Sequence, residues 1–242
     1  MGKTLVLYVF HEINNRVHSF FRNCIFKDDD VDFIVIANGY NENLDLPPFV
    51  KVVRRENKGY DFGGWSEALL RDGLYKNYDY FIFVNSSVIG PFIPSYYKDK
   101  WTSIFINGLK EDDEIKLYGI TINTERDPLF RSHIQSFFFC MDKTTLKFLI
   151  NKEIFSLTNH AKEFEDCVQN KEILMSRLII ENGWNIGVIC DYYKGVDFRF
   201  INKQPHEYNK NFLSGMMEPY YRNNIWNEYQ VVFIKGNRFG IH

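Results

Sequence analysis

The chain has 242 residues, and 29 Lys and Arg against 31 Asp and Glu give it a formal charge of −2 at pH 7. This near-balance excludes a protein whose main task is to bind nucleic acid by neutralising phosphates. Hydrophobic residues make up 45% of the chain and aromatic residues 17%, which excludes extensive disorder and low-complexity sequence.

The first 92 residues alternate strand-like and helix-like patterns. Residues 3–10 are almost entirely apolar and predict a buried strand, and helical spacing follows from Ile13 to Cys24. Further strands are predicted at residues 32–37, 50–54 and 80–84, and a second helix at about 64–74. This alternation with short connections is typical of an α/β fold with a mostly parallel sheet covered by helices on both faces.

The second half of the chain is less regular. Strands are predicted at residues 117–122, 136–141 and 184–190, and helices at 142–150 and 162–182. Asp142 is the expected N-cap of the first of these helices, and Gly183 is expected to end the second. Residues 228–238 are interpreted as a strand and a turn. No linker-like stretch or internal repeat divides the chain, so we expect one domain over residues 1–242.

The cysteines and apolar segments indicate the compartment. Cys24, Cys140, Cys167 and Cys190 are widely spaced among apolar residues, which favours reduced core cysteines over disulfides or zinc ligands. The apolar runs are far shorter than the roughly 20 residues of a membrane-spanning helix, and no signal-peptide cleavage site follows the first run. We therefore expect a cytoplasmic protein without a transmembrane segment.

Three polar segments follow predicted strands: Phe10-His11, residues 57–65 and Asn85-Ser86-Ser87. Ligands of open parallel sheets bind beyond the carboxyl ends of the strands, which is where these segments are expected. Side chains of Asn85 to Ser87 would then point into a crevice, although a simple strand-terminating turn explains this segment equally well.

The segment from Asn57 to Trp65 is the richest of the three. Its glycines would let the backbone approach a ligand, and the start of the following helix suits a diphosphate. Asp61 can accept a sugar hydroxyl, and the aromatic rings can stack on a base or sugar. The alternative is a glycine turn with aromatic rings packed beneath it. Neither the Rossmann nor the Walker A glycine pattern occurs in the chain.

Several motifs in order along the chain resemble a family. Residues 57–65 read Asn-Lys-Gly-Tyr-Asp-Phe-Gly-Gly-Trp, and residues 81–92 read Phe-Ile-Phe-Val-Asn-Ser-Ser-Val-Ile-Gly-Pro-Phe. Further matches are His-Ile-Gln-Ser-Phe-Phe at 133–138, Glu172 with Ser176, and Phe-Ile-Lys-Gly-Asn-Arg at 233–238. Together they resemble glycosyltransferases of the rhamnan-synthesis type, found in bacterial and viral polysaccharide pathways.

The resemblance implies a GT-A fold, a Rossmann-like three-layer α/β/α sandwich. It also implies a nucleoside-diphosphate-sugar donor of the UDP, GDP or dTDP type, carrying rhamnose or another hexose, and a glycan or lipid-linked saccharide acceptor. Residues 1–92 would bind the donor and residues 93–242 the acceptor. Peripheral contact with a membrane is compatible with a lipid-linked acceptor.

The resemblance also assigns roles to single residues. The residues implied for donor binding are Phe10, His11, Asn38, Asn57, Gly59, Asp61, Gly64, Trp65, Asn85, Ser86 and Ser87. His133, Gln135 and Ser136 would face the acceptor. Glu172 is the candidate general base of an inverting reaction, with Asp197 in reserve, and Asp61 is the second catalytic candidate. The alternative for Glu172, beside Lys171 and Arg177, is a solvated helix face.

Asn85-Ser86-Ser87 stands where GT-A enzymes carry the Asp-x-Asp that binds a divalent metal. Mg²⁺ or Mn²⁺ prefers hard oxygen ligands, and this triplet offers only neutral ones. Asn85, Ser87 and His206 remain the candidate ligands, and Asp61 could compensate for the missing carboxylate. Alternatively, Arg54, Arg55 and Lys58 would stabilise the leaving diphosphate.

Two other classes remain open. The missing Asp-x-Asp motivates a non-catalytic relative that binds a nucleotide sugar or glycan. A nucleotidyltransferase would use the same crevice, but it needs a Gly-rich basic loop after the first strand, where this chain has His11-Glu12-Ile13-Asn14-Asn15. The sequence does not decide between inverting and retaining chemistry.

Overall fold

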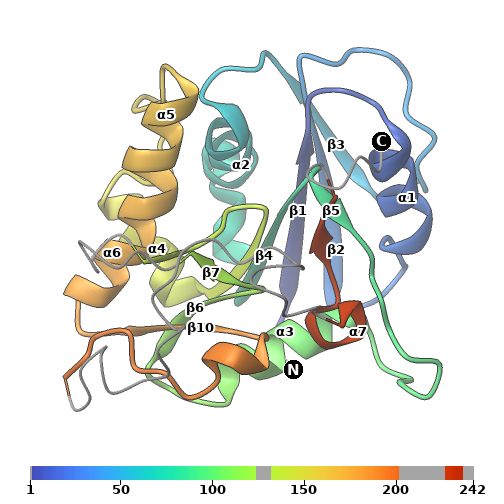
Figure 1. Ribbon diagram of the computed structural model, residues 1–242. Helices are drawn as coiled ribbons and strands as arrows, with labels where there is room; N and C mark the ends of the chain where they lie inside the picture. Colours follow the sequence, from blue (N-terminus) through green and yellow to red (C-terminus); the bar gives the residue numbers. More distant parts are fainter. Residues whose placement is uncertain (1, 124–131, 202–226, 237–242) are drawn as a thin grey trace.

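A computed structural model describes residues 2–123, 132–201 and 227–236. Its centre is a seven-stranded sheet with the strand order β10-β6-β9-β4-β1-β2-β3 (Figure 1). The strands are β1 (Thr4–Phe10), β2 (Val31–Asn38), β3 (Lys51–Arg55), β4 (Tyr80–Asn85), β6 (Ile115–Gly119), β9 (Phe138–Asp142) and β10 (Asn185–Val188). Only β9 runs against the others, so the prediction of a mostly parallel sheet is confirmed.

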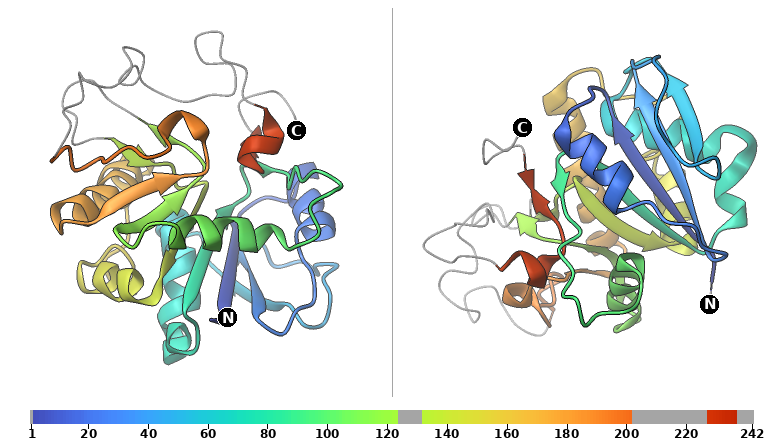
Figure 2. Two further views of the ribbon diagram at one scale, coloured as in Figure 1. Left: turned by 90° about the horizontal axis from the view of Figure 1, so that it is seen from below. Right: turned by 90° about the vertical axis from the view of Figure 1, so that its right-hand side faces the viewer.

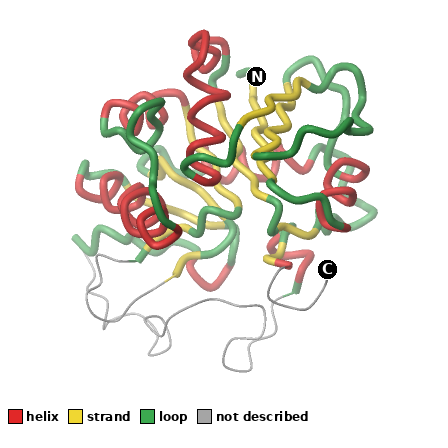
Figure 3. The backbone as a smooth tube through the Cα atoms, turned by 90° about the horizontal axis from the view of Figure 1, so that it is seen from above, coloured by secondary structure: helices red, strands yellow, loops and turns green. Residues whose placement is uncertain are grey.

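Helices cover both faces of this sheet (Figure 3). The helices are α1 (Asn15–Asn23), α2 (Tyr60–Leu70), α3 (Trp101–Lys110), α4 (Lys143–Asn151), α5 (Phe164–Cys167), α6 (Leu174–Glu181) and α7 (Glu228–Val231). The described residues also form helical stretches of other types, the 3₁₀ helices η1 (Arg71–Asn77) and η4 (Asp191–Tyr193) and the π-helix η3 (Val168–Ile173). Two small antiparallel pairs complete the fold, β5 (Val88–Ile89) with β11 (Ile234–Lys235) and β7 (Ile122–Asn123) with β8 (His133–Ile134). The arrangement is the expected Rossmann-like α/β fold.

Aromatic rings fill the core on both faces of β9. Successive side chains of a strand point to opposite faces, so Phe138 and Phe139 enter different layers. Phe138 packs on Phe105 of α3, with ring centroids 4.1 Å apart, whereas Phe139 stacks on Phe83 of β4 at 4.6 Å. Trp65 of α2 meets Phe139 edge-on at 5.4 Å. These contacts tie α2 and α3 to one strand from its two sides.

The second helix begins earlier than the sequence predicts. The expected helix at 64–74 is wrong at its start, because α2 begins at Tyr60 after Gly59, whose φ is +76°. The two following glycines lie inside the helix, where a Cβ has no space. A Cβ on Gly64 would lie 3.0 to 3.1 Å from Val9, Asn38 and Ile36 of the sheet. The glycines therefore let α2 lie close to the sheet and do not form a ligand loop.

Other expected elements agree in part with the structure. The helix predicted at 162–182 is present as α5, η3 and α6, in which η3 has π-helical geometry. Asp142 caps α4 by accepting a hydrogen bond from the Thr145 N–H at 2.7 Å, as predicted. The strand predicted within residues 228–238 is confirmed only in part, because residues 228–231 form α7 and the strand β11 is limited to residues 234–235. Helix α3 has no counterpart in the sequence-based expectation. All four cysteines are buried thiols.

Within residues 2–123, 132–201 and 227–236, none of the helices has the length and apolar character needed to cross a bilayer.

Gly63→Ala tests the close packing at the start of α2. The new Cβ would lie 2.0 Å from the Lys58 carbonyl oxygen, so the backbone must move. We expect the free energy of unfolding to fall by about 2 kcal/mol, measured by urea denaturation. Thr144→Ala, at an exposed position of α4, should change it by less than about 0.5 kcal/mol. Equal urea midpoints for Gly63→Ala and the unmodified protein would contradict this packing.

Candidate active site

The carboxyl ends of β1, β2 and β4 lie at one edge of the sheet. The first turn of α2 brings Asp61 to this edge, and β4 ends there at Asn85. The Asn85 side-chain amide donates a hydrogen bond to the Asp61 carboxylate (Nδ2 to Oδ2, 2.9 Å), and its carbonyl accepts one from the Ser87 N–H at 2.9 Å. The two predicted segments thus meet directly, and Asn85 uses both ends of its amide to join them.

Burial changes the acidity of Asp61. Removal from water raises the pKa of this carboxyl to about 6, although the Asn85 hydrogen bond and the charges of His11 and Lys235 act in the opposite direction. The charge of Glu172 adds to the increase. Asp61 and Glu172 are therefore close enough to interact electrostatically, although 110 positions of sequence lie between them.

Glu172 is held by three hydrogen bonds. Its Oε2 accepts from the Ser136 N–H at 3.1 Å and from the Ser136 hydroxyl, and its Oε1 lies 3.2 Å from Nε2 of His133. The side chain is only 15% exposed. Burial alone would raise the pKa of Glu172, but the hydrogen bonds from His133 and Ser136 and the charge of Lys235 outweigh it and lower the pKa. Glu172 is thus a buried carboxylate that is ionised at neutral pH.

The π-helical geometry of η3 explains how a residue of an amphipathic helix comes to be buried here. Such single-turn bulges rotate the helix face and occur often at functional sites. Lys171, which precedes Glu172, is also buried, and its ammonium donates to the carbonyls of Glu153 and Asn159 at 2.6 and 2.8 Å. The alternative of a solvated face for Glu172 is therefore wrong.

Two aromatic residues expected at the donor lie in the core. Trp65 is fully buried among Phe62, Phe83 and Phe139, and Phe10 is 1% exposed. A ring without exposed surface cannot stack on a ligand, so the predicted donor contacts of Trp65 and Phe10 are wrong. The aromatic residues of this segment stabilise the fold, which is the alternative the sequence left open.

Asn38 and Arg55 are used within the protein. The Asn38 amide donates to the Tyr60 carbonyl at 3.1 Å, and its oxygen accepts from Arg55 at 2.8 Å. The same guanidinium binds Glu67 at 2.8 Å and the Lys58 carbonyl at 2.6 Å. Asn38 is 2% exposed and therefore cannot border a base, and the Arg55 side chain is 5% exposed and binds three partners within the protein. Both residues instead hold the start of α2.

Four further predicted site residues are buried, and the structure corrects their roles. Gly59 faces His160, whose ring lies where a Cβ would stand, and Gly64 faces the sheet. Gln135 is 6% exposed and accepts a hydrogen bond from the Thr121 hydroxyl at 3.1 Å, so it points away from an acceptor. His133 is likewise buried and positions Glu172. Ser136 is half-buried beside Glu172.

The remaining predicted donor residues keep exposed surface. The His11 side chain is 58% exposed, Asn57 is exposed, and Ser86 and Ser87 are half-buried. Their roles stay predictions. His206 lies outside the described residues.

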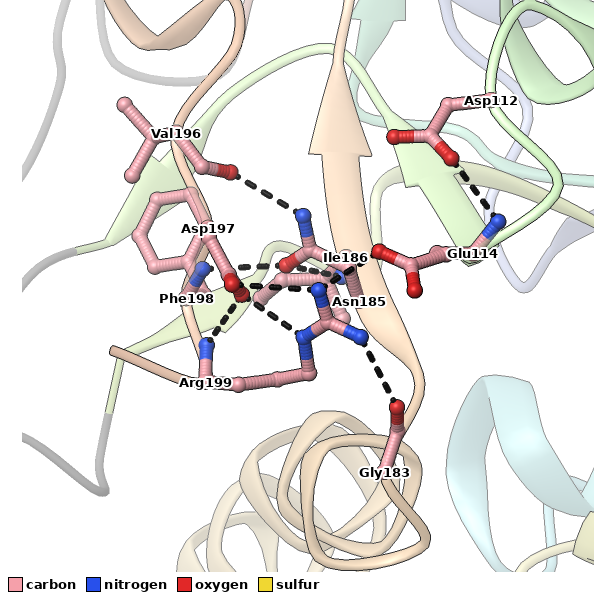
Figure 4. Close-up of polar contacts among 9 residues, drawn as sticks. All are labelled: Asp112, Glu114, Gly183, Asn185, Ile186, Val196, Asp197, Phe198 and Arg199. Atoms are coloured by element: carbon pink, nitrogen blue, oxygen red, sulfur yellow. Dashed lines mark hydrogen bonds and ion pairs between the residues drawn. The ribbon is translucent and has the colours of Figure 1, made fainter. Parts of the chain in front are cut away.

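Asp197, the reserve candidate for the base, lies in a separate cluster of polar contacts with Arg199, Glu114 and Gly183 (Figure 4). Its carboxylate binds Arg199 at 2.8 Å, and Arg199 also binds Glu114 and the Gly183 carbonyl. Glu114 and Gly183 precede β6 and β10, so this cluster is at the opposite edge of the sheet from Asn85. Asp197 is therefore not the base of this site.

Lys235 is the functional candidate that the sequence analysis missed. It belongs to β11, which pairs with β5 just after the Asn85 turn, and its charge lowers the pKa of both Asp61 and Glu172. The lysine of the closing motif Phe-Ile-Lys-Gly-Asn-Arg was the available signal. Only the pairing of distant strands shows where it lies.

The donor atoms around the turn do not suit the divalent ion that the resemblance implies. Among the described residues, no three His, Cys, Asp or Glu side chains gather in an arrangement that could hold a metal. Asn85 already uses both ends of its amide, and Ser86 and Ser87 bring no carboxylate. Asp61 is the acidic group in direct contact with the turn.

A cavity of about 420 Å³ opens between α1 and the segment after β2. Its polar lining comes from Asn15, His18, Arg22, Asn43 and Asp45, with Tyr40 and Phe21 among the apolar walls. It lies near the carboxyl ends of β1 and β2, since its walls follow these strands in the chain. Its volume is within the range of small-molecule sites.

The sequence profile of one family, described as rhamnan synthesis protein F, matches residues 34–229. The chain belongs to this family. The match confirms the resemblance and indicates a part in polysaccharide synthesis. It includes Asp61, Asn85, Ser136 and Glu172, whereas β1 and β11 lie outside the matched range. No curated protein matches the chain.

Asp61→Asn tests the electrostatics of the site through stability. The pKa of the Asp61 carboxyl is about 6 in the folded protein, whereas the ordinary value of an aspartate is 3.8. Ionisation of Asp61 therefore disfavours folding as the pH rises from about 4 through 6. An asparagine at this position cannot ionise, so the variant does not lose this stability. We therefore expect the free energy of unfolding of Asp61→Asn, measured relative to that of the unmodified protein, to be about 2–3 kcal/mol more favourable at pH 7.5 than at pH 4.

Urea denaturation at the two pH values measures this difference. Asp29→Asn, at an exposed position, should give the same stability difference at both pH values. A stability difference for Asp61→Asn that does not change with pH would show that Asp61 is not desolvated.

Proposed function

We propose that the protein is a glycosyltransferase that moves a hexose, such as rhamnose, from a nucleoside-diphosphate donor to a saccharide acceptor. One observation carries the proposal. In a member of the rhamnan synthesis family, an ionised and buried Glu172 lies within electrostatic reach of Asp61 at the carboxyl edge of a Rossmann-like sheet. Two carboxyls with opposite pKa shifts in one crevice are typical of acid–base sites.

The donor would lie along the carboxyl ends of β1, β2 and β4. The cavity beside α1 offers polar groups and an aromatic wall to the nucleoside of a UDP, GDP or dTDP sugar. Asp61 would accept a hydroxyl of the donor sugar, and the turn at Asn85 would lie beside the diphosphate. This placement agrees with the general position of ligands in open α/β sheets.

Glu172 would act as the base of an inverting displacement. The acceptor hydroxyl oxygen attacks the anomeric carbon and its proton passes to Glu172, while the bond to the diphosphate oxygen breaks and its electrons remain on the diphosphate. A carboxylate accepts a proton only when ionised, and the hydrogen bonds from Ser136 and His133 keep Glu172 in that form. They also hold its position, which supplies orientation.

An exposed and a half-buried aromatic ring support a saccharide acceptor. Phe164, at the start of α5, is 70% exposed, and its ring centroid lies 6.3 Å from that of Tyr60 at the start of α2. Tyr60 adjoins Asp61 in the chain, so these rings stand at the rim of the proposed site. Flat apolar faces beside polar groups suit the ring of a sugar.

A thermal-shift screen with UDP, GDP, dTDP and CDP sugars tests donor binding. A ligand at 100 times its dissociation constant adds about 2.7 kcal/mol, which raises the melting temperature by roughly 5–10 °C for a chain of this length. No shift with any nucleotide sugar would contradict the proposal.

Glu172→Gln tests catalysis. We expect nucleotide binding to persist and sugar transfer to fall by about 10²–10⁴-fold, because glutamine cannot accept the proton. The measurement is turnover with the donor that the screen identifies. Glu181→Gln, at an exposed position of α6, is the matched control and should retain full turnover. Binding without turnover in the unmodified protein would favour the non-catalytic relative.

A further inference from the structure

We propose that Lys235, brought to the site by β11, supplies the positive charge that binds the diphosphate, in place of a divalent metal ion. This inference rests on the proposed function and concerns the donor half of the same site. It assigns a binding role to a segment that lies outside the matched family range.

The strand pairing carries Lys235 to the turn. β11 runs antiparallel to β5, with Lys235 opposite Val88 and Ile234 opposite Ile89 (Figure 2). The N–H of Gly236 donates to the Ser87 carbonyl at 2.7 Å, which extends this pairing to the turn itself. Lys235 is therefore fixed beside Asn85-Ser86-Ser87 by main-chain hydrogen bonds, independently of its own side chain.

The side chain of Lys235 extends toward the loop that holds Glu172. Its Nζ lies 5.7 Å from the centroid of the Phe137 ring. Phe137 follows Ser136, which binds Glu172, and the Phe137 carbonyl accepts a hydrogen bond from the Asn85 N–H at 3.1 Å. The ammonium thus stands between the turn after β4 and the loop before β9, where donor and acceptor would meet.

The charge of Lys235 affects the acidity of two carboxyl groups. Lys235 lowers the pKa of Asp61 and of Glu172, which agrees with an ammonium placed near both. A diphosphate bound at the same place would gain the same attraction, which is large in a partly dehydrated crevice.

Arg16 supports the turn from its other side. Its guanidinium Nε donates to the Ser86 carbonyl at 3.1 Å, and its Cδ would lie 3.1 Å from a Cβ on Gly236. Arg16 and β11 therefore contact each other and grip the turn together. Arg16 is a positioning residue here, whereas the side chain of Lys235 supplies the charge.

Other candidates for this charge are less suitable. Arg55 is committed to Glu67, Asn38 and the Lys58 carbonyl. A divalent ion favours carboxylate ligands, which Asn85, Ser86 and Ser87 do not supply, and the Asn85 amide is already bound to Asp61 and to the Ser87 N–H. The side chains of the turn are neutral, whereas a metal site needs carboxylates. The cations Lys235 and Arg16 beside the turn supply the positive charge that a metal ion would otherwise bring.

The chemistry needs no additional group. When the bond between the anomeric carbon and the diphosphate breaks, both electrons go to the β-phosphate oxygen. The Lys235 ammonium donates a hydrogen bond to a β-phosphate oxygen and keeps its proton. The charge that develops in the transition state is then offset by a group already in place.

Calorimetric titration of the whole chain in EDTA tests this inference, with UDP, GDP and dTDP and the corresponding monophosphates as probes. We expect a diphosphate to bind without added metal. Lys235→Met should weaken that binding by roughly tenfold or more, since a charge-assisted hydrogen bond is lost. The monophosphate, which lacks the β-phosphate, should bind with unchanged affinity, and Lys235→Arg should restore diphosphate binding.

Lys27→Met is the matched control, because Lys27 is exposed and lies before the amino end of β2, whereas the proposed site lies at the carboxyl ends of the strands. Its diphosphate affinity should equal that of the unmodified protein. Equal weakening of monophosphate and diphosphate binding in Lys235→Met would indicate a structural role and overturn the inference.

Two other results would also overturn it. The first is diphosphate binding that EDTA abolishes and Mn²⁺ or Mg²⁺ restores, and the second is unchanged diphosphate affinity in Lys235→Met. Both leave the glycosyltransferase proposal intact, because a nucleotide still binds. If no nucleotide binds under any condition, the proposed function itself fails, and the role of Lys235 fails with it.

Discussion

The site depends on the hydrogen bonds that keep the Glu172 carboxylate ionised inside the protein. A buried charge without partners would take up a proton or destabilise the fold. Ser136 and His133 meet this requirement, and in doing so they join the loop before β9 to the helical run that contains η3. The Ile134 N–H donates to the Ser176 hydroxyl at 3.1 Å and strengthens the same junction. The position of the carboxylate is thus a property of the fold.

The other charges of the crevice are arranged around this group. Asp61 lies in a similarly dry environment but accepts a hydrogen bond from a neutral amide, so its carboxyl is much less acidic than that of Glu172. The two carboxyls therefore differ because of their partners. Arg16 and Lys235 stand on either side of the intervening turn, so this edge of the sheet holds both signs of charge. Such a mixture suits a substrate that has hydroxyl groups at one end and phosphates at the other.

Periodicity predicted the sheet well, because β1, β2 and β4 are buried on both faces and their apolar runs have no competing interpretation. It failed at α2, where glycines that permit close packing have the same appearance in sequence as glycines that permit ligand approach. Asp61 and Asn85 were singled out because polar segments that follow predicted strands are conspicuous, whereas Glu172, in the helical stretch η3, was singled out by the resemblance to the family. Trp65 was assigned to the donor because its burial depends on residues far away in the chain, which the local sequence does not show. Lys235 was missed for the same reason, since its place depends on the pairing of β11 with the distant strand β5.

The pairing of β11 with β5 also affects how the protein matures. It joins residues 88 and 235, so it forms only after most of the chain has been synthesised. The sheet from β1 to β4 uses residues within the first 85 and can assemble much earlier. A nascent chain would therefore possess the folded strands β1 to β4 before it possessed Lys235. Under the proposed function, Lys235 would then complete the site late in synthesis, and a protease that cut before β11 would remove sugar transfer while leaving most of the core intact.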